Sequence, residues 1–192
     1  MGDEFLDEGT LYVAKFNADG TGTWIALVHG QNGLTEDNAT LSFTSQASVL
    51  VNTRTAADVV GATKMDRPEW CAVSPTTGEI YLTLTNNSGR GQGSNPGVDA
   101  PNPRNYTDTR GASTLRGNVN GHILRMKEDG DENAATSFKW DIYLFGAQSD
   151  ADARIAGADA TGQRAIADRV GIWLSHVSAV WLVVMALAGA AL

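Results

Sequence analysis

Residues 70–85, WCAVSPTTGEIYLTLT, are the stretch of sequence that best predicts the fold. A short apolar run leads into a turn that contains proline and glycine, and the chain returns through residues in which apolar and polar side chains alternate. Alternation with a period of two is typical of a β-strand with one buried face. Two such runs, joined by a turn of Ser, Pro, Thr and Gly, predict a β-hairpin.

Two further segments have the same pattern. Residues 10–28, TLYVAKFNADGTGTWIALV, place a turn sequence between two apolar runs. Residues 121–145 begin with GHILRM and end with FKWDIYLF, and a polar turn lies between these runs. Three hairpins separated by long loops favour the blades of a β-propeller over a sandwich. We therefore predict a mainly β fold, a partial β-propeller in which the three hairpins belong to adjacent blades.

The segments between the hairpins predict a helix, a short loop and a long loop. Residues 53–62 predict a short helix that ends near Gly61. Arg67 precedes Pro68, which predicts an extended backbone at Arg67, in a loop that leads into a strand. Residues 86–120 are polar and contain few large apolar side chains, so we expect a long loop that is either functional or disordered.

The composition limits the classes of partner. The chain has 192 residues and a net charge of −8, with a pI of about 4.7. An acidic surface repels the phosphate backbone, so we expect no nucleic-acid binding. Acidic excess suits a protein that binds Ca²⁺ or several metal ions, although it is also ordinary for a solubilising surface. The one cysteine, Cys71, excludes an internal disulfide, and its apolar neighbours predict a small core residue.

The C-terminal part has a different composition. Residues 148–169 are rich in Ala, Asp, Gly and Arg, which we interpret as a linker, whereas residues 170–192 contain no charged side chain. Such a run predicts a helix and is long enough for a transmembrane span. The abrupt change near Gln148 also favours a change of reading frame, in which case the run only resembles a span. Residues 1–5 have neither the positive charge nor the apolar stretch of a signal peptide.

A longer pattern surrounds the central hairpin. Residues 56–70, AADVVGATKMDRPEW, are followed by AVSPTTGEIYLTLTNN at residues 72–87 and by GHILR at residues 121–125. These segments resemble the PhoX family of secreted bacterial alkaline phosphatases. The resemblance covers roughly residues 9–147, and we assign a PhoX-like propeller region to residues 1–147. It implies a propeller enzyme that holds iron and calcium ions and is periplasmic or secreted.

The resemblance also implies roles for two side chains. Arg67 would contact the substrate phosphate, and Glu69 would be a metal ligand for Ca²⁺ or Fe³⁺. These roles suit the residue types, because a guanidinium is a permanently charged fork that matches phosphate oxygens and a carboxylate supplies hard oxygens to these ions. From the residues alone, the commoner interpretation of Asp66, Arg67 and Glu69 is a surface loop held by salt bridges.

Weaker candidates lie at the ends of the predicted strands. Asn86 and Asn87 could offer carbonyl oxygens to Ca²⁺, but loop capping is the more usual role at a strand end. His122 follows a glycine at the start of a strand, where a packed or hydrogen-bonded histidine is commoner than a metal ligand. The acidic residues 129–132 predict a solvated hairpin turn.

The sequence therefore predicts a fragment of a metal-dependent phosphate-ester hydrolase. The PhoX family is several times longer than one hairpin cluster, and much of its N-terminal half, including other metal ligands, has no counterpart here, so we expect the chain to be inactive alone. Two alternatives stay open. The chain could be a non-enzymatic, propeller-derived binding fragment, or a small acidic domain anchored to a membrane by residues 170–192.

Overall fold

The computed structural model describes residues 9–146, and its fold is mainly β, as predicted. Most strands form one antiparallel sheet, and two form a separate hairpin. Two short helices follow one another between the second and third strands. The strands are β1 (Tyr12–Phe16), β2 (Thr21–Ala26), β3 (Pro68–Val73), β4 (Ile80–Leu84), β5 (Tyr106–Arg110), β6 (Ser113–Gly117), β7 (His122–Glu128) and β8 (Ser137–Phe145), and the helical elements are α2 (Gln46–Val51), α3 (Thr53–Val59) and the 3₁₀ turn η1 (Asp129–Asp131).

The six-stranded sheet has the order β1-β2-β8-β7-β4-β3, and neighbouring strands are antiparallel. The three predicted hairpins are confirmed as β1–β2, β3–β4 and β7–β8. Their assignment to adjacent blades is wrong, because β4 pairs with β7 along its whole length and joins the second and third hairpins in one sheet. Strands β3, β4, β7 and β8 therefore form a four-stranded meander, which is the form of a single propeller blade.

The first hairpin joins this meander through a short contact. Within the ladder, β2 pairs with β8 only at Thr21–Thr23, opposite residues 137–139. The approach is close because Gly22 has no side chain, and a Cβ there would lie 2.1 Å from the Phe138 ring. The indole N–H of Trp140 donates to two carbonyl oxygens of the first hairpin. The absence of a side chain at Gly22 therefore allows the first hairpin and the meander to meet.

Two apolar clusters hold these elements together. The larger one lies on one face of the sheet and consists of Phe16, Leu84, Leu124, Met126, Phe138, Ile142 and Phe145. The second packs the helices against the chain that follows β2 and consists of Leu27, Leu34, Phe43, Val49 and Ala56. Full burial of a large apolar side chain contributes about 1.5–3 kcal/mol. This packing stabilises α2 and α3, which are too short to persist alone.

The helix predicted at residues 53–62 is confirmed as α3, and Gly61 follows its end with a φ of +76°. The sequence before it gives no clear pattern, yet α2 forms there. Its N-terminus is capped by Ser45, whose side chain accepts a hydrogen bond from the Ser48 N–H. A local capping bond and the burial of Val49 thus stabilise a helix that no periodic sequence pattern predicts.

Strand β3 has no partner on its outer side among the described residues, and nearly all its side chains are exposed. Cys71 is exposed, so the prediction that it is a core residue is wrong. Its apolar neighbours are themselves at the surface, with Trp70 52% and Val73 57% exposed. An apolar run therefore indicated a strand here but not a buried one.

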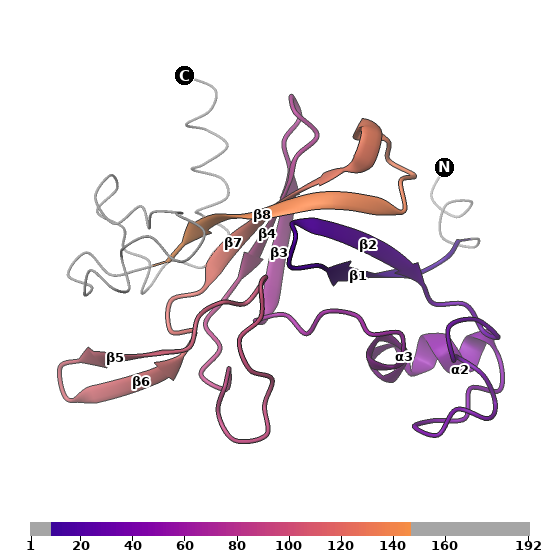
Figure 1. Ribbon diagram of the computed structural model, residues 1–192, viewed down its shortest axis with the longest axis horizontal. Coiled ribbons are helices and arrows are strands. Elements are labelled where there is room, and N and C mark those ends of the chain that lie inside the picture. The colour runs from indigo at the N-terminus through magenta and orange to yellow at the C-terminus, as the bar shows by residue number, and fades with distance from the viewer. Residues whose placement is uncertain (1–8, 147–192) are drawn as a thin grey trace.

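Residues 86–120 are an insertion with a defined conformation between the two central strands, so of the two predicted alternatives, a functional or a disordered loop, the structure excludes disorder. Two backbone hydrogen bonds join Asn87 to Asn118, which closes the insertion at its base. Strands β5 and β6 form a hairpin within it. Figure 1 shows this hairpin at the opposite end of the molecule from α2 and α3. The meander thus continues from β4 to β7 although a long excursion separates them in sequence.

None of the helices within residues 9–146 is long and apolar enough to cross a membrane. The predicted linker at residues 148–169 and the predicted helix at residues 170–192 lie outside the described residues. Residues 1–5, which lack the features of a signal peptide, also lie outside them. Those expectations stay predictions.

Candidate phosphate and metal site

Arg67 and Glu69 lie together where β3 begins, beside the end of β4. The guanidinium Nη2 of Arg67 is 3.6 Å from the carboxylate Oε1 of Glu69, and the two side chains are 59% and 48% exposed. An exposed ion pair of this kind contributes little to stability. The structure therefore brings the two predicted site residues together and leaves both accessible to a ligand.

The backbone reaches this arrangement in an unexpected way. Arg67 has a φ of +43°, in the left-handed region, so the extended conformation predicted from Pro68 is wrong. The Arg67 N–H donates to the Met65 carbonyl at 3.1 Å and closes a tight turn around Asp66. A β-bulge at the start of β3 then makes Glu69 an extra residue in the strand. The turn and the bulge, rather than regular alternation, bring the two side chains together.

The end of β4 holds both side chains. The Nη1 atom of Arg67 donates to the carbonyl oxygen and the side-chain Oδ1 of Asn86, at 3.3 and 3.2 Å. The Thr85 hydroxyl donates to Oε1 of Glu69 at 3.2 Å. The Thr85 N–H also donates to the Arg67 carbonyl oxygen. Asn86 thus supports the loop, as predicted, and both strands contribute to one exposed polar site.

The Asp66 carboxylate, next in the chain to Arg67, is completely buried. Its Oδ1 accepts hydrogen bonds from Arg90 Nε and Asn87 Nδ2, both at 2.7 Å, and its Oδ2 accepts one from Asn118 Nδ2 at 2.9 Å. The Arg90 side chain is only 1% exposed. A buried pair of this kind needs both partners, because removing one leaves an uncompensated charge. We refer to Asp66, Asn87, Arg90, Asn118 and His122 as the buried polar cluster.

His122 completes this cluster in its neutral form. Its Nδ1 accepts from Asn118 Nδ2 at 2.9 Å, and its Nε2 donates to the Pro101 carbonyl at 2.7 Å. Burial lowers the pKa of His122 to about 4, while the bond to Pro101 and the charge of Asp66 oppose the shift and nearby guanidinium groups add to it. The two partners therefore assign the proton to Nε2. A packed, hydrogen-bonded histidine is what the sequence predicted at this position.

Sequence reasoning gave Asn87 only as a loop cap or calcium ligand and missed the remaining members of the buried polar cluster. Asp66 lies among other charged residues, which suggests a solvated surface, and Arg90 lies in a polar segment without periodicity. Arg90 also donates to the carbonyls of Lys64 and Gly97, at 2.8 and 2.9 Å. The cluster joins residues from both ends of the insertion. The abundance of asparagine in residues 86–120 is the one signal that buried amide bonding was needed.

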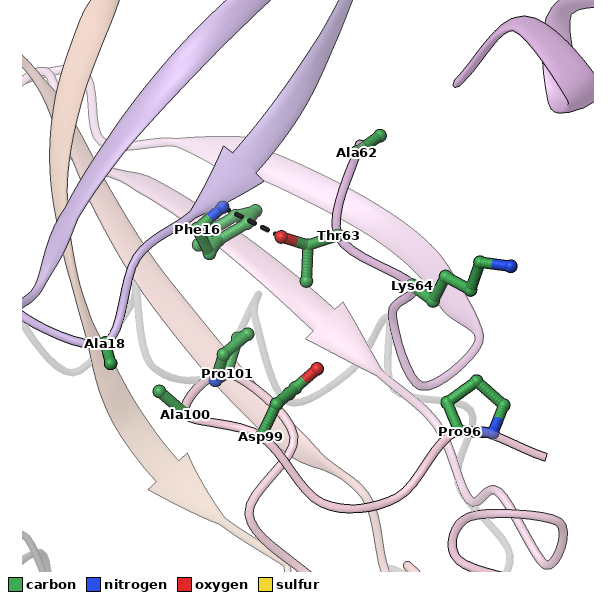
Figure 2. A pocket seen from close by; sticks show the side chains of 9 residues that line it. All are labelled: Phe16, Ala18, Ala62, Thr63, Lys64, Pro96, Asp99, Ala100 and Pro101. Carbon is green, nitrogen blue, oxygen red and sulfur yellow. Dashed lines mark hydrogen bonds between the residues drawn. The ribbon is translucent and has the colours of Figure 1, made fainter. Parts of the chain in front are cut away.

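A separate pocket of about 360 Å³ lies between the end of β1 and the insertion, as Figure 2 shows. It is lined by Phe16, Ala18, Ala62, Thr63, Lys64, Pro96, Asp99, Ala100 and Pro101. Its Thr63 hydroxyl accepts from the Phe16 N–H, and its Lys64 ammonium pairs with a carboxylate of α3. Neither Arg67 nor Glu69 lines it. The pocket is therefore not the predicted phosphate site.

The described residues do not by themselves fit a calcium or iron cluster. Within residues 9–146, no group of three or more His, Cys, Asp and Glu side chains is placed to hold a metal ion. Asp66 is unsuitable because both its oxygens accept hydrogen bonds from buried donors. Glu69 is exposed and fits as one ligand, whereas Ca²⁺ takes about six to eight oxygens. A complete site needs ligands from outside these residues.

Comparison with known proteins assigns a family. The family model described as alkaline phosphatase PhoX matches residues 2–184. The chain belongs to the PhoX family. This match is wider than residues 9–147, on which the resemblance in the sequence was based. Among curated proteins, no match is found.

This PhoX chain is also similar to a solved structure, that of Pseudomonas fluorescens PhoX in complex with vanadate, a transition state analogue. The identity is 46% and the TM-score is 0.61. The match covers 73% of this chain and 23% of that chain. The likeness confirms the predicted fold class, a partial β-propeller. This chain therefore corresponds to about a quarter of the length of its relative.

Proposed function

We propose that this PhoX chain supplies the phosphate-contacting arginine and one metal-binding carboxylate to the site of a phosphate-monoester hydrolase. The observation that carries the proposal is the exposed pair of Arg67 and Glu69, 3.6 Å apart at one strand end. The chain that presents this pair is 46% identical to a PhoX described with bound vanadate. By the same family relationship, we propose a periplasmic or secreted protein.

Arg67 has the chemistry to bind the phosphate group. Its guanidinium keeps its charge at all physiological pH values and can offer two parallel N–H donors to two oxygens. The bonds to Asn86 use Nη1, whereas the contact with Glu69 involves Nη2 at a distance longer than a hydrogen bond. A phosphate oxygen can therefore approach the Nη2 side without breaking a strong existing bond.

Glu69 would hold a metal ion beside this phosphate. The family implies Ca²⁺ and Fe³⁺, and when bound such ions neutralise charge on the phosphoryl group and activate the attacking oxygen. Glu69 supplies one of the ligands, and its bond from the Thr85 hydroxyl orients the carboxylate. The remaining ligands would come from other parts of an assembled propeller.

A non-enzymatic role is the second candidate. The observation that favours it is that the pair of Arg67 and Glu69 already forms a surface ion pair, and that in the described part of the chain no group of three or more His, Cys, Asp and Glu side chains is placed to hold a metal ion. In that case the fragment would act as a binding surface, and phosphate would have no measurable affinity for Arg67. Membrane attachment through residues 170–192 belongs to this candidate and is tested by carbonate extraction.

The decisive experiment uses a chimera in which residues 9–146 replace the matched segment of Pseudomonas fluorescens PhoX. With Ca²⁺ and Fe³⁺ supplied, we expect p-nitrophenyl phosphate hydrolysis. Arg67→Ala should lower kcat/KM by about 10- to 150-fold for each phosphate hydrogen bond lost, because a charge-assisted hydrogen bond is worth about 1.5–3 kcal/mol. The kcat/KM of Arg67→Lys should lie between the values for Arg67→Ala and the unsubstituted chimera, since lysine keeps the charge but lacks the forked guanidinium.

The control is Arg54→Ala, which removes an exposed arginine from α3. It should leave kcat/KM unchanged. A chimera that is equally active with Arg67→Ala and with Arg54→Ala would exclude Arg67 from phosphate binding.

A further inference from the structure

The buried polar cluster lies directly against the exposed site, and the proposed chemistry leaves it without a role. We propose that Asp66 is a positioning residue for the phosphate site, whose buried carboxylate fixes the turn that presents Arg67 and Glu69. This inference rests on the proposed function, because it concerns how that site is held.

Asp66 is held by both its side chain and its backbone. Its two carboxylate oxygens accept from Arg90, Asn87 and Asn118, at 2.7, 2.7 and 2.9 Å. Its N–H donates to Oδ1 of Asn102 at 2.8 Å. With the residue 0% exposed, water cannot replace any of these bonds. Position and orientation of this residue are therefore fixed more firmly than those of its exposed neighbours.

The next residue, Arg67, has a backbone that its own sequence disfavours. A φ of +43° is uncommon for a residue other than Gly, Asn or Asp, and a following proline favours an extended backbone instead. Strained backbone persists where the surrounding structure determines it. Two contacts hold the Arg67 backbone in this conformation. The buried Asp66 lies on one side, and on the other side the Thr85 N–H donates to the Arg67 carbonyl oxygen.

The segment before β3 and the segment after β4 carry matched pairs of residues at this point. Asp66 accepts from Asn87 inside the protein, and Arg67 donates to Asn86 at the surface. Residues adjacent in one segment thus bind residues adjacent in the other, with the buried Asp66 bound to the half-buried Asn87 and with an exposed pair beside them. Displacing the inner pair must displace the outer pair, because one peptide unit joins the members on each side.

The cluster also leaves the Arg67 guanidinium free to face outward. A carboxylate next to an arginine would normally attract it, but both Asp66 oxygens are already occupied by buried donors. Arg90 balances the Asp66 charge at 2.7 Å. Asp66 can therefore hold the turn without competing with phosphate for Arg67.

The test variant is Asp66→Asn combined with Arg90→Gln, which removes both buried charges together and leaves neither unpaired. The control is Arg125→Gln with Asp141→Asn, which removes another arginine–aspartate pair, between β7 and β8. Two readouts are used. The first is the ¹⁵Nε signal of Arg67 in the full 192-residue chain, assigned with Arg67→Lys. The second is the inhibition constant of inorganic phosphate for the chimera described above.

We expect the double variant at Asp66 and Arg90 to move the Arg67 signal and to weaken phosphate inhibition on the order of 10- to 100-fold, as small misplacements of a binding group do. The control pair should change neither. If the double variant does not fold, Asn87→Ser takes its place, because it removes one donor to Asp66. This variant should raise the inhibition constant of phosphate by about threefold or more.

The inference is overturned if the Arg67 signal and the phosphate inhibition constant are unchanged in the Asp66 variants while Arg67→Ala weakens inhibition. If Arg67→Ala itself leaves inhibition unchanged, the proposed function fails, and the Arg67 signal alone then decides whether Asp66 positions the loop. The two failures are therefore distinguishable.

Discussion

At the residue scale, Glu69 is the carboxylate whose role is most open to measurement. It accepts one hydrogen bond from Thr85 and lies 3.6 Å from Arg67, which leaves lone pairs for a metal ion. We predict that Glu69→Gln lowers both the bound metal and the activity of the chimera, because an amide is a weaker ligand for hard cations than a carboxylate. Metal content is measured by mass spectrometry of the purified protein.

The matched control is Glu132→Gln, at an exposed position in the turn before β8. It should leave metal content unchanged. Equal metal content in the two variants would remove Glu69 from the proposed site, whatever happened to activity.

His122 predicts a dependence of stability on pH. Burial lowers its pKa to about 4, whereas in the unfolded chain its pKa is about 6.5. The unfolded state therefore takes up a proton first, so the stabilisation is complete above pH ~6.5 and is lost as the pH falls towards 4, by up to about 3 kcal/mol.

This prediction is checked by chemical denaturation of the 192-residue chain between pH 7.5 and 5. His122→Gln should flatten the dependence in this window, since carboxylates titrate mainly at lower pH. Parallel pH profiles for the two proteins would show that His122 is not the group responsible.

The residues of the site differ in how far the sequence could predict them. Arg67 and Glu69 came from the family resemblance, and the structure shows that they meet. Asp66 could not be recognised, because its environment depends on Arg90 and Asn118, which fold back from the insertion. The backbone of Arg67 also departs from the rule for a residue before proline, since tertiary bonds override that local preference.

At the element scale, the hairpins were predictable and their order was not. Alternation of apolar residues sets β3–β4 and β7–β8 locally, and those strands are confirmed. The pairing of β4 with β7 crosses the insertion, so no short-range pattern reports it. The hairpin of β5 and β6 was missed because its strands are rich in Thr, Asp and Arg rather than in alternating apolar residues.

Gly121, at the start of β7, predicts a large effect of a small substitution. Its φ is +69°, and a Cβ there would lie 2.3 Å from the Leu84 carbonyl oxygen of the neighbouring strand. We predict that Gly121→Ala lowers the free energy of unfolding by about 3 kcal/mol or more, because backbone strain of about 1–3 kcal/mol is added to a clash with backbone atoms.

Gly30→Ala is the control for this effect. Gly30 has a φ of +84° but nothing within 4 Å of a built Cβ, so the substitution adds strain without a clash. Urea denaturation of both variants separates the two contributions. A loss for Gly121→Ala no greater than that for Gly30→Ala would show that the strands can move apart at this point.

At the scale of the whole molecule, the described residues form one blade and an added hairpin rather than a closed ring. The outer strand β3 exposes Trp70 and Val73, and it has no further strand beside it among these residues. Exposed apolar side chains along an unpaired edge are usually covered in the native assembly. The site at the start of β3 lies on this same edge.

This arrangement leads to a prediction about activity. The relative is matched over only 23% of its chain, and the described residues offer one exposed carboxylate beside Arg67. A cluster of hard cations requires several carboxylates, so we predict little or no p-nitrophenyl phosphate hydrolysis by the purified 192-residue chain, even with Ca²⁺ and Fe³⁺ supplied. The chimera should hydrolyse the same substrate under the same conditions, because it restores the other ligands.

Inactivity of the chain alone therefore needs an active chimera as its positive control. Strong metal-dependent hydrolysis by the 192-residue chain alone, lost with Arg67→Ala, would mean that its own residues complete the site and that the prediction is wrong.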